Sequence, residues 1–183
     1  MISRNLLIRY FSKLIFFIAF KFNPIKTSRK MGVQIGDDCV IYGNNPNMWG
    51  TEPFLIRLGN NVHITQGCKL ITHDGGTLIL RQYTTDLEYT APIIIGDDVY
   101  MGMETLVLPG VTIGNNVIIG ARSVISKDIP SNSVCVGAPA RIIKTVDEYH
   151  EIMKKKSLKI GHLKGDAKAN ALKEIYQDFI KKD

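Results

Sequence analysis

The sequence predicts a mainly β protein, a solenoid of short parallel strands, and two observations support this prediction. The first is a large apolar residue at every sixth position of one stretch of the chain: Ile95, Met101, Val107, Ile113, Ile119 and Ile125. The second is the small or β-branched fifth residue of each hexad, from Val99 to Ile129. A period of six fits neither an α-helix nor a hairpin strand. It fits a coil with three flat sides of one hexad each, so Ile95 and Ile113 should stack in successive coils.

The hexads divide the chain into three segments. Residues 1–30 form a basic N-terminal segment, residues 31–144 form the solenoid, and residues 145–183 form a C-terminal extension with helical patterns at 146–155 and 167–182. A helical cap on the open end of a solenoid is expected, because that end exposes apolar side chains. Turn-forming residues interrupt the repeat at 43–53, and a polar loop interrupts it at 74–92. Uninterrupted hexads then run from 95 to 130. Long loops on a rigid scaffold often carry function, so the loop at 74–92 is a candidate part of the site.

The net charge of +6 is concentrated at the N-terminus. Residues 1–30 hold seven basic residues and no acidic residue, which leaves 16 basic and 17 acidic residues in the rest of the chain. This distribution argues against a general nucleic-acid-binding surface.

The N-terminal segment has an amphipathic helical pattern. Its longest uncharged apolar run, 14–20, is seven residues long, far below the ~20 that span a bilayer. Several apolar side chains share one helical face: Leu7, Phe11, Leu14, Ile15 and Ile18. Two interpretations stay open. The helix packs on the protein or on a neighbouring subunit, or residues 1–23 lie on an anionic membrane surface at its inner, cytoplasmic face.

The three cysteines show no metal-ligand spacing. Cys39 and Cys68 occupy the fifth position of their hexads, so they are predicted to be buried small side chains. Nothing indicates a disulfide framework, and a reducing cytoplasm is the expected location.

The hexads occur together with THDGG at 72–76, LPGVTIG at 108–114 and VGAPARII at 136–143. This combination resembles the hexapeptide-repeat acyltransferase superfamily, and is most similar to the O-acetyltransferases of polysaccharide biosynthesis and of maltose and galactoside. The resemblance covers residues 31–144. It implies a left-handed parallel β-helix, a homotrimer with active sites between adjacent subunits, and acetyl-CoA as the donor, with no metal required.

The resemblance also implies roles for individual residues. His73 matches the catalytic histidine of the family. The matches to the cofactor-binding positions are Gly102, Met103 and Ala121 at the pantetheine, Ser126 and Lys127 beside the cofactor, and Arg141 and Lys144 at the nucleotide phosphates. Lys144 stands where an arginine is common. A lysine keeps the charge but loses bidentate geometry, so weaker phosphate positioning is expected there.

These residue types suit acetyl transfer to a hydroxyl. A hydroxyl is a poor nucleophile until its proton leaves, and an imidazole, which ordinarily titrates near pH ~6.5, can take that proton. A backbone N–H near Gly102 is a candidate donor to the developing oxyanion. Direct attack on the thioester in a ternary complex needs no serine or cysteine nucleophile.

Asp74 either orients the imidazole of His73 or shapes the turn that follows it, and both interpretations stay open. Further carboxylates that could orient the base or the acceptor are Asp86, Glu88 and Glu104. The pairs Asp97–Asp98 and Asn115–Asn116 recur at equivalent hexad positions, which favours turn corners. The aromatic residues of the two interruptions either stack on a sugar ring or pack within the protein: Trp49, Tyr83 and Tyr89.

The leading hypothesis is O-acetylation of a saccharide in capsule, exopolysaccharide or lipopolysaccharide assembly. The nearest alternative is N-acetylation of a nucleotide-linked amino sugar. A zinc hydratase of the carbonic anhydrase type needs three histidines, whereas the repeat region offers only His63 and His73. A non-catalytic trimeric scaffold has no use for His73, Arg141 and Lys144 together.

Overall fold

The structure is a computed structural model that describes residues 15–43 and 45–181. The chain divides into two units, one ending at Val146 and the other beginning at Asp147. The predicted interactions of Leu7, Phe11 and Leu14 lie outside the described residues.

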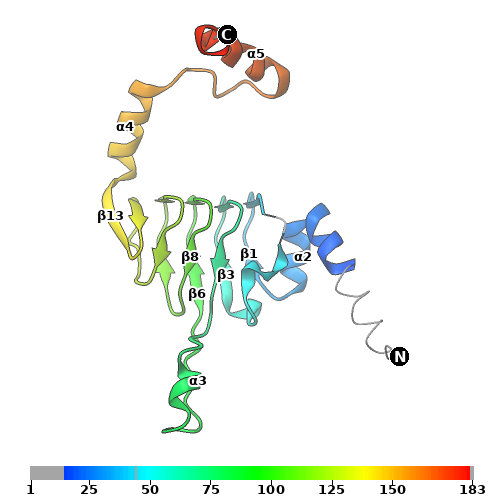
Figure 1. The fold of residues 1–183 in the computed structure, drawn as a ribbon, viewed down its shortest axis with the longest axis vertical. Helices are drawn as coiled ribbons and strands as arrows, with labels where there is room; N and C mark the ends of the chain where they lie inside the picture. Colours follow the sequence, from blue (N-terminus) through cyan, green and yellow to red (C-terminus); the bar gives the residue numbers. More distant parts are fainter. Residues whose placement is uncertain (1–14, 44, 182–183) are drawn as a thin grey trace. The chain divides into compact units, whose positions relative to one another are not determined.

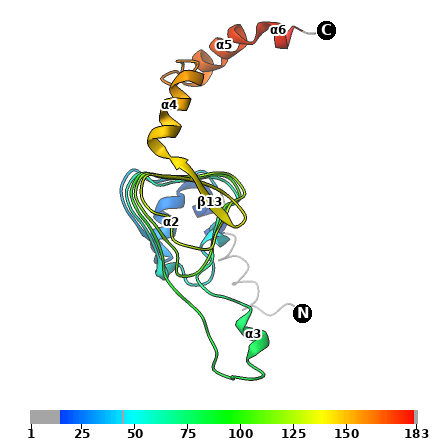
Figure 2. The same cartoon turned by 90° about the vertical axis from the view of Figure 1, so that its left-hand side faces the viewer.

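The first unit is a parallel β-helix built from three sheets (Figure 1). Its coils are seen end on in Figure 2. Sheet A contains β1 (Gln34–Ile35), β3 (Ile56–Leu58), β6 (Ile93–Ile95) and β9 (Thr112–Ile113). Sheet B contains β2 (Val40–Ile41), β4 (His63–Ile64), β7 (Val99–Met101), β10 (Val117–Ile119), β12 (Ser133–Gly137) and β13 (Ala140–Thr145). Sheet C contains β5 (Lys69–Leu70), β8 (Leu106–Val107) and β11 (Val124–Ile125).

The apolar side chains of the repeat fill the interior. Ile95 pairs with Ile113 across sheet A, and Leu106 pairs with Val124 across sheet C. The first residue of each hexad is at most 1% exposed: Ile95, Met101, Val107, Ile113, Ile119 and Ile125. Parallel strands buried in this way gain most of their stability from apolar area removed from water.

The last coil is shorter than the hexad pattern predicts. Val117 pairs with Ser133, and Ile113 forms a bridge with Ile129, so partners there are 16 residues apart. The Asp128 carboxylate accepts a hydrogen bond from the Thr112 N–H at 2.7 Å and tightens this corner. The expectation of regular hexads up to residue 130 was therefore wrong, because Ile129 takes the place of a first hexad residue.

Asp and Asn residues form the corner between sheets A and B. Five of them have a positive φ of 51–57°: Asp38, Asn61, Asp98, Asn116 and Asn132. Asp and Asn tolerate this conformation better than other residues with a side chain. From the second coil onward, the side chain before each of them accepts a backbone hydrogen bond from the preceding coil, as Asn115 Oδ1 does from the Asp97 N–H at 2.8 Å. The Asp97–Asp98 and Asn115–Asn116 pairs are thus turn corners.

Helices cover the first coil. Residues 15–22 are helical, and α2 (Pro24–Lys30) follows after Asn23, whose side chain accepts from the Lys26 N–H. The interruption at 43–53 contains the short helix η1 (Pro46–Trp49), and η2 (Pro53–Leu55) follows it. Trp49 is fully buried and donates from Nε1 to Ser28 Oγ at 2.8 Å. Trp49 therefore belongs to the core beneath α2, and stacking of its ring on a sugar is excluded.

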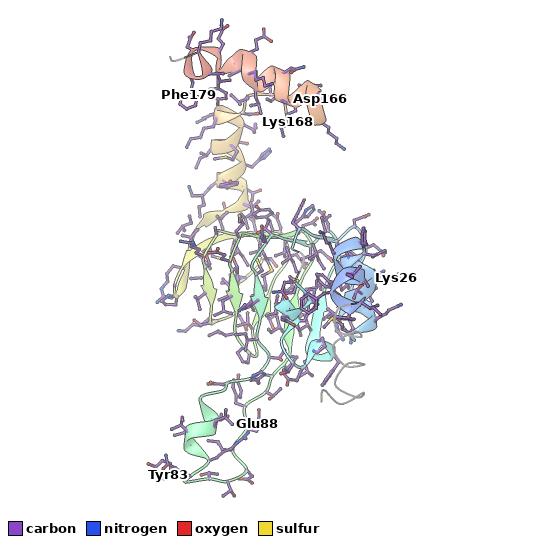
Figure 3. All side chains as sticks on the ribbon, turned by 45° about the vertical axis from the view of Figure 1, so that its right-hand side comes forward. Lys26, Tyr83, Glu88, Asp166, Lys168 and Phe179 are labelled. Carbon is purple, nitrogen blue, oxygen red and sulfur yellow. The ribbon has the colours of Figure 1, made fainter. Side chains whose placement is uncertain are left out.

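The loop at 74–92 projects from the β-helix as an arm (Figure 2). Its stem is fixed where His73 bridges Thr90 and where the Asp74 N–H donates to the Tyr89 carbonyl at 2.9 Å. The arm contains α3 (Thr77–Leu80), and Arg81 forms an ion pair with Glu88. Figure 3 shows Tyr83 and Glu88 on this arm, away from the coils.

The second unit is helical in its described part. It contains α5 (Gly165–Ile175), α6 (Gln177–Ile180) and almost all of α4 (Val146–Lys156). The helical patterns predicted at 146–155 and 167–182 agree with these elements to within a few residues.

Candidate active site

The His73 imidazole lies against a carboxylate from the first interruption of the repeat. Its Nδ1 is 2.9 Å from Glu52 Oε2 and 3.2 Å from Thr51 Oγ1. The His73 side chain is 37% exposed, so the ring is open to solvent on one side. With Nδ1–H donated to the carboxylate, Nε2 carries a lone pair that can accept a proton.

Three donors converge on the Glu52 carboxylate. The Thr51 hydroxyl donates to Oε1 at 2.6 Å, the Thr72 hydroxyl donates to Oε2 at 2.6 Å, and His73 donates to Oε2. The hydrogen bonds from Thr51, Thr72 and His73, in that order of importance, lower the pKa of Glu52 to about 2. Glu52 is therefore ionised at neutral pH and holds the ring in the tautomer that leaves Nε2 free.

Sequence reasoning missed Glu52. Counting back one coil of 18 residues from His73 reaches Leu55, but the interruption at 43–53 breaks the period and brings Glu52 to this place. The only sequence signal is a lone acidic residue in that interruption, and no spacing rule joins it to a histidine 21 positions later.

Three of the four carboxylates proposed from sequence, Asp74, Glu88 and Glu104, are engaged elsewhere. Asp74 Oδ1 accepts a hydrogen bond from the Gly76 N–H at 2.8 Å. This contact favours the interpretation that Asp74 shapes the turn. Glu104 forms an ion pair with Arg122 at 2.6 Å, and Glu88 forms one with Arg81.

We define the histidine corner as the turns between sheets C and A, which follow β5, β8 and β11. It holds His73 at one level and Ser126–Lys127 two coils further on. Ser126 and Lys127 line a cleft of about 400 Å³, together with Asp128, Ile129, Ala140, Arg141 and Ile142. The structure thus brings three predicted cofactor residues together: Ser126, Lys127 and Arg141. Lys144 lies further along β13, where it pairs with Val134, and does not line this cleft.

We define the glycine corner as the turns between sheets B and C, where Gly102, Met103 and Ala121 lie in successive coils. The Arg122 N–H donates to the Met103 carbonyl at 2.7 Å, so the two turns are stacked. A Cβ at Gly102 would lie 2.5 Å from the Ala121 nitrogen, which explains the glycine. The Gly102 N–H itself donates to the Ile119 carbonyl at 2.8 Å. An oxyanion donor at this corner must therefore be a neighbouring amide.

The two corners lie at opposite ends of the strands of sheet C. One chain thus carries His73 at one end of these strands and the predicted pantetheine surface at the other. His73 and the Ser126–Lys127 turn thus share the histidine corner. Gly102, Met103 and Ala121 share the glycine corner.

The two aromatic residues of the arm differ in their distance from His73. Tyr89 lies at the stem, where a Cβ at Gly110 would be 2.9 Å from its hydroxyl, so it borders the histidine corner. Tyr83 is 79% exposed and far out on the arm (Figure 3). Of these two residues, Tyr89 is therefore the one beside the histidine corner.

His63 does not join His73. It lies on β4, and its ring nitrogens contact Tyr42 Oη and Asn61 Oδ1, each at 3.0 Å. Within residues 15–43 and 45–181, no three His, Cys, Asp or Glu side chains gather as metal ligands. In the same part of the chain, no helix has the length and apolar character needed to cross a bilayer.

Comparisons with known proteins agree with this architecture. Residues 92–127 match the family described as bacterial transferase hexapeptide (six repeats). Protein CapG of Staphylococcus aureus is 46% identical over 121 residues, which cover 66% of this chain and 70% of CapG. Galactoside O-acetyltransferase of Escherichia coli K12 is 32% identical over 126 residues, 68% of this chain and 60% of that enzyme.

A solved structure shows the same fold. It is a hexapeptide-repeat acetyltransferase of Vibrio cholerae complexed with acetyl coenzyme A, and it superposes with a TM-score of 0.51 at 19% identity. The match covers 78% of this chain and 90% of that protein.

Proposed function

Because this chain belongs to the bacterial transferase hexapeptide family, we propose that it is an acetyltransferase that moves the acetyl group of acetyl-CoA to a saccharide hydroxyl. The proposal includes the left-handed winding of the β-helix that the resemblance implies. The observation that carries it is the hydrogen bond from His73 Nδ1 to the ionised Glu52, because it leaves Nε2 free to act as a base.

In the proposed reaction, Nε2 of His73 takes the proton of the acceptor hydroxyl while the oxygen attacks the thioester carbonyl carbon. The C–S bond then breaks, and the thiolate of CoA receives the proton from the imidazolium. Each turnover therefore returns His73 to its starting state. Glu52 is a positioning residue that fixes the tautomer and stabilises the transient positive charge on the ring.

The cleft beside Arg141 fits the nucleotide end of CoA. Lys127 and Arg141 supply two cations, and Ser126 supplies a hydroxyl, around a space of about 400 Å³. Arginine and lysine are the usual partners of phosphate groups. When bound, the donor would supply the acetyl thioester.

We further propose a homotrimer whose active sites are shared between subunits. The separation of the histidine and glycine corners by sheet C supports this arrangement, because a second copy can set its glycine corner beside His73. The acceptor class follows from the same resemblance: a saccharide in capsule, exopolysaccharide or lipopolysaccharide assembly. One relative of this chain is named galactoside O-acetyltransferase, and a galactoside is a sugar derivative.

The test pairs CoA binding with acetyl transfer. Calorimetry of the full chain with CoA should give micromolar binding, equivalent to about −8 kcal/mol. Acetyl transfer is then measured to hydroxyl-only saccharides and to matched amino sugars. His73→Ala should bind CoA normally and lose transfer by about 10²- to 10⁴-fold. His162→Ala, an exposed histidine of the second unit, is the matched control.

Two outcomes would overturn the proposal. Absence of CoA binding up to millimolar concentration would remove the donor. Transfer confined to amino groups would replace O-acetylation by N-acetylation of an amino sugar.

A further inference from the structure

The helix at residues 15–22 has apolar side chains on two opposite faces. Phe20 is fully buried in the core that also contains Val33. On the other face, Ile15 is 62% exposed, Ile18 48% and Phe22 83%. Positions 15, 18 and 22 follow the i, i+3, i+7 spacing of a single helical stripe. The inner face is thus satisfied by the β-helix, and the outer stripe is not.

Exposed lysines lie on this helix and on α2, which follows it. Lys21 lies on the helix at 15–22, and Lys26 and Lys30 lie on α2; all three are exposed. The first acidic residue of the chain is Asp37, so no carboxylate in the preceding sequence offsets them. Figure 3 shows Lys26 at the end of the β-helix that α2 covers. Exposed apolar side chains and exposed lysines thus alternate along residues 15–30, on the two helices that cover the first coil.

We propose that this surface, the N-terminal face (Ile15, Ile18, Lys21, Phe22, Lys26 and Lys30), docks the protein on an anionic lipid bilayer. Aliphatic and aromatic side chains enter the boundary between headgroups and acyl chains, while lysines meet anionic headgroups. A second copy of the chain is a poorer partner, because it would bring the same excess of positive charge. A nucleic acid matches the lysines but leaves the apolar stripe exposed to water.

The test is flotation of the full-length protein with lipid vesicles, either of neutral phosphatidylcholine or of phosphatidylcholine with about 30 mol% phosphatidylglycerol, which makes the surface anionic. Lys21→Glu/Lys26→Glu is the charge variant, and Lys155→Glu/Lys168→Glu in the second unit is its matched control with the same net charge. Ile18→Ser/Phe22→Ser is the apolar variant, and Leu78→Ser/Ile79→Ser on the exposed α3 is its control.

Wild type is expected to float with anionic vesicles and not with neutral ones, with weaker binding at high salt. The charge variant should lose at least about thirtyfold in partition, because each lysine near such a surface contributes about 1 kcal/mol and the two glutamates add repulsion. The apolar variant should lose at least about tenfold, and both controls should bind as wild type does. Melting temperature and CoA affinity, measured on each variant, show that it is folded.

Equal flotation of all variants, or no flotation of wild type, would overturn the proposal. A different result would assign the face to a second copy of the chain. In that case wild type does not bind vesicles but forms a larger assembly as its concentration rises, and Ile18→Ser/Phe22→Ser abolishes this assembly. These readouts do not depend on acetyl transfer, so they stand or fall separately from the proposed reaction.

Discussion

The Nδ1 atom of His73 lies 2.9 Å from Glu52 Oε2, although 21 positions separate the two residues. The contact joins the first interruption of the repeat to the residue that opens the arm. Because Thr51 and Thr72 also donate to this carboxylate, it is fixed before any substrate arrives. The imidazole is therefore oriented by the protein itself.

Glu52→Gln should lower kcat by about 10- to 100-fold and leave the KM for acetyl-CoA nearly unchanged. The amide removes the negative charge that stabilises a protonated ring, and its NH₂ group opposes the donors that surround it. Steady-state kinetics with varied donor measures the split. Thr51→Ser, which keeps the hydroxyl donor, is the control. A rise in the KM for acetyl-CoA with unchanged kcat would show that Glu52 serves donor binding instead.

Glu52 should also make stability depend on acid. Its pKa is lowered from 4.5 to about 2 by the hydrogen bonds of Thr51, Thr72 and His73. A carboxyl group with a depressed folded-state pKa contributes stability above its unfolded pKa, and this contribution is lost as pH falls through the folded pKa. The difference in melting temperature between wild type and Glu52→Gln should thus be greatest above pH 4.5 and shrink toward pH 2. A constant difference across this range would contradict the assignment.

Gly102→Ala should destabilise the first unit by about 1–3 kcal/mol. The new Cβ would lie 2.5 Å from the Ala121 nitrogen and 2.8 Å from the Gly120 carbonyl carbon, and stacked backbone cannot move aside as a flexible side chain can. Gly75→Ala is the matched control, because its Cβ would meet no atom within 4 Å. Chemical denaturation of both variants measures the difference. Equal stability of the two would show that the glycine corner is looser than its geometry indicates.

Arg141 and Lys144 should contribute unequally to CoA affinity, although the family resemblance pairs them. Arg141 lines the cleft beside Ser126 and Lys127, whereas Lys144 lies further along β13. Charge-assisted hydrogen bonds contribute about 1.5–3 kcal/mol, so Arg141→Ala should weaken binding at least about tenfold. Lys144→Ala should weaken it by less than about threefold, because Lys144 is half-buried and lies outside the cleft. Calorimetry distinguishes the two, and equal losses would return Lys144 to the phosphate site.

The sequence predicted those parts of the fold that its period controls. Ile95 and Ile113 were expected to stack, and they pair across sheet A. The same spacing predicted that Asp97–Asp98 forms a turn corner, and it does. Where the period breaks, prediction failed for a physical reason: a loop of irregular backbone has no register from which a contact can be counted. Glu52 and the buried Trp49 both lie in such an interruption.

The shortened last coil is a failure of another kind. Ile129 fits the small or β-branched fifth position of a hexad, and it fits the first position of the following strand equally well. The hydrogen bond from the Thr112 N–H to Asp128 favours the shorter turn, and a hydropathy pattern does not encode such a bond. The catalytic roles of His73 and its partners came from resemblance, and they stay predictions.

The sharing of active sites between subunits can be tested by mixing two inactive variants. His73→Ala removes the base and keeps the glycine corner, whereas Ala121→Glu blocks the glycine corner and keeps the base. If each site takes its histidine corner from one subunit and its glycine corner from another, mixed trimers regain intact sites. Every mixed trimer, whether it holds one or two copies of either variant, then has one intact site in three, so the activity of the purified mixed trimers should return to about a third of wild type. Co-expression with two affinity tags, followed by sequential purification and acetyl-transfer assays, measures this recovery. Mixtures as inactive as the parent variants would place both halves of the site within one chain, and the separation of the two corners across sheet C makes that outcome the unexpected one.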